Sequence, residues 1–352
     1  MQGGQCWESK AGGLSSEGAA LSTLSPRAAP IIPQSPISNS PGTGHLHLTN
    51  PSRARFSSLL GTYPLKLLSP TPLPSQPSHL AIAYTLAYGG GLVAGDLISL
   101  RILVERGCGL ILLTQGSTKV FKHRPGIRPL SHSIVRSPLA ENQPSRQRMH
   151  VTLEPGSLVL ILPDSISPFR NSRYSQTQRF VLPPCRTASV LILDWVNSGR
   201  ADQRGETEKE IWAMDSYAST NEVVVGDRLI MRERMVLDNP IPAESTANPK
   251  DDQLSKVACR LAPYHIYSTI LIHGPHFASL IRRLNDMTDR TTQFQLPRPP
   301  GLVWSFSPIE DTGGVLRVAG VEVESVRKWL RETLAAGGIA DMVGEGLWPR
   351  LI

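Results

Sequence analysis

The sequence lacks most of the features that mark secreted, membrane-spanning or zinc-binding proteins. Its 352 residues include only four cysteines, which are widely separated: Cys6, Cys108, Cys185 and Cys259. This spacing excludes a zinc knuckle or a CxxC motif. Cys108 and Cys185 lie in apolar runs of strand length, so we expect reduced, structural thiols and a reducing compartment. No apolar run reaches the roughly 18 residues that a membrane span needs, and the N-terminus shows no secretory signal pattern, so we expect a cytoplasmic protein.

Aromatic residues are also scarce, at 6% of the chain, whereas there are 30 prolines and 29 glycines. This composition favours short strands joined by turns. Residues 98–104 alternate between apolar and polar, and residues 221–238 are typical of a hairpin that turns at Gly226. Such segments follow one another without intervening helices. They predict a mainly β fold, a large antiparallel, sandwich-like scaffold.

Two segments have helical periodicity instead. In residues 275–286 the apolar side chains recur at the positions of an amphipathic helix. Residues 323–338 repeat this pattern and end at Gly337, a favourable helix stop. We expect both helices to pack against the β scaffold.

Low-complexity stretches predict where the folded part begins and where it is interrupted. Residues 1–43 are rich in Ser, Pro and Gly and lack apolar periodicity, so we expect a disordered tail. Residues 44–352 are expected to form one β-rich domain. Polar, proline-bearing stretches at about 137–148 and 238–256 predict mobile insertions within it.

Motifs for nucleotide binding and nucleophilic catalysis are absent from the sequence. A P-loop places its lysine directly after a glycine, whereas here two residues separate Gly116 from Lys119. No G-x-S-x-G nucleophile elbow occurs. We therefore expect no catalytic residues, and a protein that is not an enzyme.

Two histidine pairs have spacings that could serve a metal ion. His45 and His47 share one side of a predicted strand, and His273 and His276 flank a Gly-Pro turn. No carboxylate or thiol is close in sequence to the second pair. Exposed positions on a strand and at a helix start are the favoured interpretation of both pairs.

Three carboxylates, Asp96, Glu154 and Asp164, stand beside Gly or Pro at the ends of predicted strands. An acidic residue there most commonly accepts hydrogen bonds from the backbone of its own turn. The alternative is that these oxygens line a polar passage, and the sequence alone favours the turn role.

Positive charge is concentrated between Lys119 and His150, where seven basic residues accompany a single acid, Glu141. One interpretation is a β-rich nucleic-acid-binding module that uses this segment, although the aromatic side chains that stack on bases are missing there. There are two other interpretations of this segment: a solvated loop, and a basic edge that docks an acidic protein.

Several stretches together resemble the urease accessory protein D family (UreD), and more closely its eukaryotic, fungal-like members. The resemblance covers about Gly44 to Trp348. It is carried by "YGGGLVAGDLISLRILVERGCGLILLTQGSTKVFK", "LPDSISPFRNSRYSQTQRF", "DWVNSGRADQRGETEKEIWAMDSY" and "VLRVAGVEVESVRKWL".

The resemblance implies a non-enzymatic, mostly β protein that helps to mature urease. Its expected partners are the helical accessory protein F, the GTPase protein G bound through protein F, and apo-urease, without nucleic acid or a membrane. Nickel is expected to pass through an internal channel as transient nickel(II), with no tightly bound cofactor. Asp96, Glu154 and Asp164 are the candidate residues for this passage.

Two further groups of positions follow from the resemblance. Near the C-terminus, Trp348 and Leu351 are candidates for binding protein F, with packing on the sheet as the alternative. The remaining positions are structural ones in the family motifs: Gly89, Gly90, Gly91, Gly95, Gln115, Gly116, Lys119, Arg173, Tyr174, Gly199 and Arg200.

Overall fold

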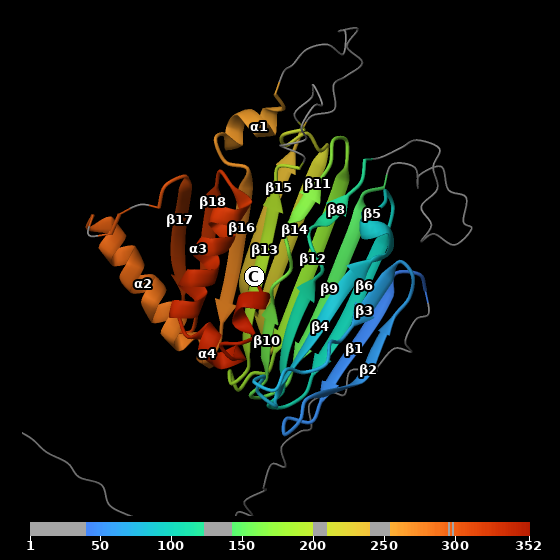
Figure 1. Ribbon diagram of the computed structural model, residues 1–352, viewed down its shortest axis with the longest axis vertical. Helices are drawn as coiled ribbons and strands as arrows, with labels where there is room; N and C mark the ends of the chain where they lie inside the picture. Colours follow the sequence, from blue (N-terminus) through green and yellow to red (C-terminus); the bar gives the residue numbers. More distant parts are fainter. Residues whose placement is uncertain (1–39, 123–142, 200–209, 240–253, 295, 298) are drawn as a thin grey trace, which may run out of the picture. The chain divides into compact units, whose positions relative to one another are not determined.

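The computed structural model describes residues 40–122, 143–199, 210–239, 254–294, 296–297 and 299–352. The chain divides into two units, Met1–Pro36 and Ile37–Ile352, and every described residue belongs to the second. The predicted disordered tail therefore lies almost wholly outside the described residues and stays a prediction. The description below concerns the second unit (Figure 1).

Two β-sheets dominate this unit, which confirms the mainly β prediction. The first sheet has seven strands. In spatial order they are β15 (Arg228–Asp238), β14 (Ser216–Val225), β12 (Arg173–Leu182), β9 (Ser145–Leu153), β6 (Leu97–Val104), β1 (Thr43–Thr49) and β2 (Arg55–Gly61).

The second sheet has eleven strands, eight of which form a continuous path. These are β17 (Leu302–Ile309), β18 (Gly313–Gly320), β16 (Ile266–His273), β13 (Ser189–Asn197), β10 (Leu158–Ile161), β7 (Gly109–Thr114), β4 (Leu80–Ala87) and β3 (Leu65–Leu68). Three short strands lie beside this path: β5 (Gly91–Leu92), β8 (Thr118–Val120) and β11 (Ile166–Pro168).

The central strands of both sheets are parallel, so the prediction of an antiparallel scaffold was wrong there. In the first sheet, β1, β6, β9, β12 and β14 pair in parallel, as β4, β7, β10 and β13 do in the second. Parallel neighbours need a crossover connection, which is usually a helix. Here the chain returns through a strand of the opposite sheet, from β6 to β7, then to β9 and β10, then to β12 and β13. Antiparallel pairing is confined to the outer strands and to the β14–β15 hairpin, which turns at Gly226 as predicted.

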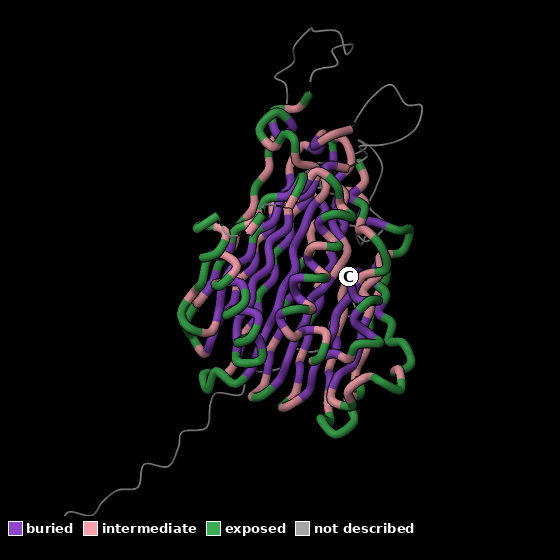
Figure 2. Tube along the Cα trace, turned by 60° about the vertical axis from the view of Figure 1, so that its left-hand side comes forward, coloured by how far each residue is buried: buried purple, intermediate pink, exposed green. Residues whose placement is uncertain are grey.

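Two apolar clusters hold these layers together. The first is built from the facing sides of the two sheets, with Leu46, Ile102, Val151 and Ile192 among its buried members. The second lies on the other side of the eleven-stranded sheet. Because both faces of that sheet are covered, its central strands are mostly apolar, and β13 is buried over all but its last residue. Figure 2 shows this burial following the strands through the interior.

Helices cover the outer face of the eleven-stranded sheet, as Figure 1 shows for α3. The two predicted helices are confirmed as α2 (Ala278–Thr292) and α3 (Val323–Ala336), which contact β17 and β18. Each turns a stripe of buried apolar side chains to the second cluster. Two short helices, α1 (Lys256–Leu261) and α4 (Ile339–Val343), complete the described α-helices, and η1 (Tyr88–Gly90), η3 (Pro275–Phe277) and η4 (Trp348–Arg350) are 3-10 turns. In the described part of the chain, none of the helices is both long and apolar enough to cross a bilayer.

The chain end is buried, contrary to the expectation of an exposed apolar surface. Trp348 and Leu351 are 4% and 6% exposed and belong to the second cluster. Their apolar groups are therefore already covered by this chain. The two side chains pack against the eleven-stranded sheet, as in the alternative interpretation.

Some other local expectations also change. Cys185 lies in an exposed turn rather than in a strand, while Cys108 is buried as expected. His273 is buried because it is the last residue of β16, whereas His276 is exposed. The predicted insertions lie mostly outside the described residues, but residues 145–148 belong to β9 and residue 238 ends β15.

Candidate functional site

A polar cluster lies between the two sheets, inside an otherwise apolar core. Its centre is Asp194 on β13, which is 7% exposed. Three side chains of the opposite sheet donate to its carboxylate. Gln176 Nε2 lies 3.3 Å from Oδ1, and Ser219 Oγ and Asn221 Nδ2 lie 2.5 Å and 2.6 Å from Oδ2. Because these donors come from β12 and β14, the cluster bridges the sheets.

Burial governs the protonation of this cluster. It raises the pKa of Asp194 above the ordinary value of 3.8, while the hydrogen bonds from Ser219, Asn221 and Gln176 act in the opposite direction. Burial also raises the pKa values of Tyr174 and Tyr217 well above 10, with the Asp194 charge adding to the shift. Both phenols therefore stay neutral at physiological pH.

Tyr174 extends the cluster toward β9. Its hydroxyl lies 2.8 Å from the Oε1 atoms of both Gln147 and Gln176, and its ring stacks on that of Tyr217 with the centroids 5.5 Å apart. A single hydroxyl proton can satisfy only one of these amide oxygens at a time. The arrangement leaves acceptor capacity in the interior.

Two further oxygens are unsatisfied within the described residues. Gln178 Oε1 and Asn221 Oδ1 are buried and accept no hydrogen bond there. A buried oxygen without a donor costs free energy, unless water or a cation supplies its partner. The core thus contains a carboxylate and unsatisfied amide oxygens, which are ligands suited to a cation.

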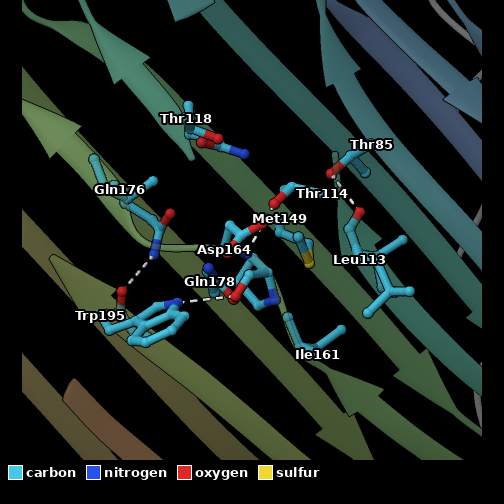
Figure 3. Close-up of a pocket in the computed structure, with 15 residues that line it drawn as sticks. Thr85, Leu113, Thr114, Thr118, Met149, Ile161, Asp164, Gln176, Gln178 and Trp195 are labelled. Atoms are coloured by element: carbon cyan, nitrogen blue, oxygen red, sulfur yellow. Dashed lines mark hydrogen bonds between the residues drawn. The ribbon is translucent and has the colours of Figure 1, made fainter. Parts of the chain in front are cut away.

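A cavity of about 30 Å³ opens beside this cluster (Figure 3). It has room for about one water molecule, whose share of liquid volume is about 30 Å³. Asp194, Gln176, Gln178, Gln147, Thr114 and Thr118 supply polar groups to its wall. None of the described residues that line it is a histidine or cysteine.

A second cavity, of about 110 Å³, adjoins the first and extends toward the C-terminal residues 349–352. The two share Leu113, Thr114, Pro163, Asp164 and Trp195 in their walls. Asp164 lies at this junction, where its Oδ1 accepts a hydrogen bond from Arg327 Nη2 at 2.6 Å. The Arg327 guanidinium also lies over the Trp195 ring, 5.3 Å from its centroid. The two cavities thus share wall residues, and the Asp164–Arg327 ion pair lies at their junction.

The three predicted passage carboxylates do not form one group. Asp96 precedes β6 and Glu154 follows β9. These two strands are parallel, with Leu97 opposite Arg146 at one end and Val104 opposite Leu153 at the other. The two acids are therefore at opposite ends of the strands, roughly 25 Å apart at about 3.3 Å per residue. Among the described residues, no three His, Cys, Asp or Glu side chains gather closely enough to hold a metal ion.

Asp96 and Glu154 both accept hydrogen bonds from backbone amides, Asp96 within its own turn and Glu154 from a different turn of the chain. Asp96 Oδ2 accepts from the Val93 amide at 2.8 Å, and Glu154 Oε2 accepts from the Arg106 amide at 3.0 Å. Their part in metal passage stays a prediction. Asp164 alone of the three lines the cavities.

Sequence reasoning missed Asp194 and its partners. A signal was present, since Asp194 interrupts the apolar run "VLILDWV" and Gln176 and Gln178 alternate in β12 with residues that face outward. A charged residue in a strand buried on both faces needs partners, and only the structure shows which strand supplies them.

Several family-motif residues occupy positions with a local structural reason. Gly89 and Gly90 have φ values of +82° and +73°, which favour glycine. At Gly91 a side chain would approach the Lys119 carbonyl oxygen to 2.4 Å. Arg173 pairs with Asp215 at 3.0 Å. Arg200 lies outside the described residues, and the other motif glycines, Gly95, Gly116 and Gly199, have positive φ.

Comparison with known proteins defines the class. The model of the UreD urease accessory protein family matches residues 41–349. Urease accessory protein 4 of Cryptococcus neoformans var. grubii is 57% identical over 326 residues, 91% of this chain and 98% of the relative. Urease accessory protein UreD of Sorangium cellulosum is 34% identical over 85% of this chain and 82% of its own. Urease accessory protein D of Oryza sativa subsp. indica is 27% identical over 81% of this chain and 88% of its own length.

The chain therefore belongs to the UreD urease accessory protein family. This confirms the resemblance, and membership supports a role in urease maturation as an accessory protein.

Proposed function

We propose that this chain is a non-catalytic maturation factor that conducts nickel(II) toward apo-urease in the cytoplasm, together with accessory proteins F and G. The observation that carries the proposal is the buried Asp194 cluster with its adjoining cavities. An apolar core gains nothing from a buried carboxylate, whose desolvation is costly, so its presence calls for a function.

The donor set suits transit better than storage. Nickel(II) binds imidazole strongly, whereas carboxylate, amide and water oxygens are weaker ligands for it. Asp194, Gln176, Gln178 and the threonines supply oxygen ligands to the cavity wall, beside the thioether of Met149. A relay must release its cargo, and weak oxygen ligands favour release.

Asp164 is the proposed second residue of the route, at the junction of the cavities. Its carboxylate is held by Arg327, so a cation that arrives there would compete with the guanidinium. Asp96 and Glu154 remain candidates at the strand ends. No tightly bound cofactor is part of this proposal.

Partners are proposed on the family relationship, with protein F and apo-urease in direct contact and protein G bound through protein F. The nucleic-acid alternative rests on the segment 119–150, of which residues 123–142 lie outside the described residues. No further observation favours it.

Reconstitution tests the proposal. Apo-urease is incubated with nickel, GTP, proteins F and G, and either the full chain or buffer. We expect urease activity to require the chain, and size-exclusion chromatography to show it bound to protein F. Equal activation without the chain would overturn the proposed function.

A further inference from the structure

The outer face of the seven-stranded sheet is open and strongly basic. The basic face, as we name it, consists of Arg101, Arg148, His150, Arg179, Arg232 and Arg234, all exposed. Their strands alternate buried with outward-facing residues, so these side chains share one face of β6, β9, β12 and β15. The two long helices pack on the other sheet.

Strand register aligns these charges in two adjacent rungs. Arg101 pairs with His150, and His150 pairs with Arg179. Arg148 lies one rung away, two residues along β9, with Arg234 in the same rung at the far edge of the sheet. Arg148 lies opposite Ser99 and Thr177, so it is a diagonal neighbour of both Arg101 and Arg179, within reach of long side chains.

The described residues neutralise this face only in part. Glu222 pairs with Arg179 at 3.0 Å and with Arg232 at 2.8 Å. Arg101, Arg148 and Arg234 have no ion pair within the described residues. Burial, followed by the nearby Arg179 and Arg101 charges, lowers the pKa of His150, as expected of a site at positive potential.

An apolar rung runs beside the charged ones. It contains Leu103 and Val181, both partly exposed, with Thr152 between them. Arginine is enriched at protein interfaces and among the residues that carry their binding energy. By contrast, no Phe, Tyr or Trp belongs to these rungs, as base stacking would require.

We propose that the basic face docks a carboxylate-rich surface of a partner protein. A second copy of this chain would place arginine against arginine. The most acidic segment outside the described residues, 240–253, carries three acids against one lysine, too few to neutralise the face. Arginine binds carboxylates bidentately, so an acidic protein surface supplies both the charge and the geometry.

Charge reversal in the full chain tests the docking surface. The face variant is Arg101→Glu/Arg148→Glu, and neither of its substitutions breaks an ion pair among the described residues. The matched control is Arg282→Glu/Arg283→Glu on α2, which changes the net charge equally at exposed positions. Affinity is measured for purified apo-urease, for purified protein F and for poly-L-glutamate at physiological salt.

The expected result is that the face variant loses at least tenfold in affinity for poly-L-glutamate and for one of the two proteins, while the control changes less than twofold. Unchanged affinity for both proteins, or equal losses in the control, would overturn the docking proposal. Retention of duplex DNA, lost only in the face variant while both protein complexes persist, would assign the face to nucleic acid instead.

This test is independent of nickel transfer. If the wild-type chain binds neither protein, the proposed function fails. In that case the affinity for poly-L-glutamate alone tests the docking proposal. If the face variant and the control bind poly-L-glutamate equally well, the docking proposal is contradicted.

Discussion

Asp194 is a carboxylate in a strand buried on both faces, and its environment decides its behaviour. The hydrogen bonds to its oxygens act to lower its pKa, yet burial outweighs them and raises it. The folded chain therefore binds this proton more tightly than the unfolded chain does. The contribution of Asp194 to stability is fully present below pH 3.8 and falls as pH rises through the raised pKa of the folded state.

Asp194→Asn removes this pH dependence at nearly constant volume. We expect the free energy of unfolding of the wild type, relative to the variant, to decrease with rising pH above about 3.8. The decrease should be about 1.4 kcal/mol for each unit by which the pKa is raised. Urea denaturation of both proteins between acid and neutral pH measures it. Parallel stability curves would show that Asp194 has an ordinary pKa.

Two substitutions of Asp96 distinguish a structural role of this residue from a role in nickel transport. Asp96→Ala leaves the Val93 amide without its acceptor and should cost about 1–3 kcal/mol, whereas Asp96→Asn keeps an acceptor oxygen and should cost less. We expect both variants to lower urease activation, and the alanine variant to lose more stability than the asparagine variant. If Asp96→Asn activates urease as the wild type does, Asp96 is not on the nickel route.

Secondary-structure elements show which features the sequence could reveal. The stripes of α2 and α3 and the Gly226 hairpin follow from local periodicity and turn chemistry. Strand direction does not, because an alternating strand reads the same in parallel and antiparallel pairs. Asp194 was visible as a polar residue in an apolar strand, but Gln176 and Asn221 join it only through the pairing of β12 with β14.

The C-terminal residues show that solvent exposure cannot be inferred from a position near the end of the chain. Trp348→Ala would leave a cavity in the second apolar cluster and should cost about 3–5 kcal/mol of stability. Denaturant unfolding, monitored by circular dichroism, measures the loss. An unchanged stability together with lost binding to protein F would restore Trp348 as an interface residue. Truncation at Ala319 cannot replace this substitution, since it also removes α3 and with it part of the cluster.

For the molecule as a whole, the two sheets divide the proposed tasks. Their facing sides enclose the polar cluster and the smaller cavity, and the outer face of the seven-stranded sheet carries the exposed arginines. This separation predicts that Arg101→Glu/Arg148→Glu weakens docking without altering the interior, while Asp194→Asn alters the interior without weakening docking. Chromatography of both variants with apo-urease and protein F tests the distinction. Loss of docking in Asp194→Asn would contradict it.

The central claim is that nickel passes through the interior by way of Asp194. Its most direct test is the nickel content of urease, measured by mass spectrometry after assembly with proteins F and G and the full chain. Asp227→Asn, in the exposed β14–β15 turn, is the matched control. We predict that Asp194→Asn forms the same complex but delivers less than a tenth of the nickel delivered by wild type or control. Full nickel occupancy with Asp194→Asn would contradict the passage.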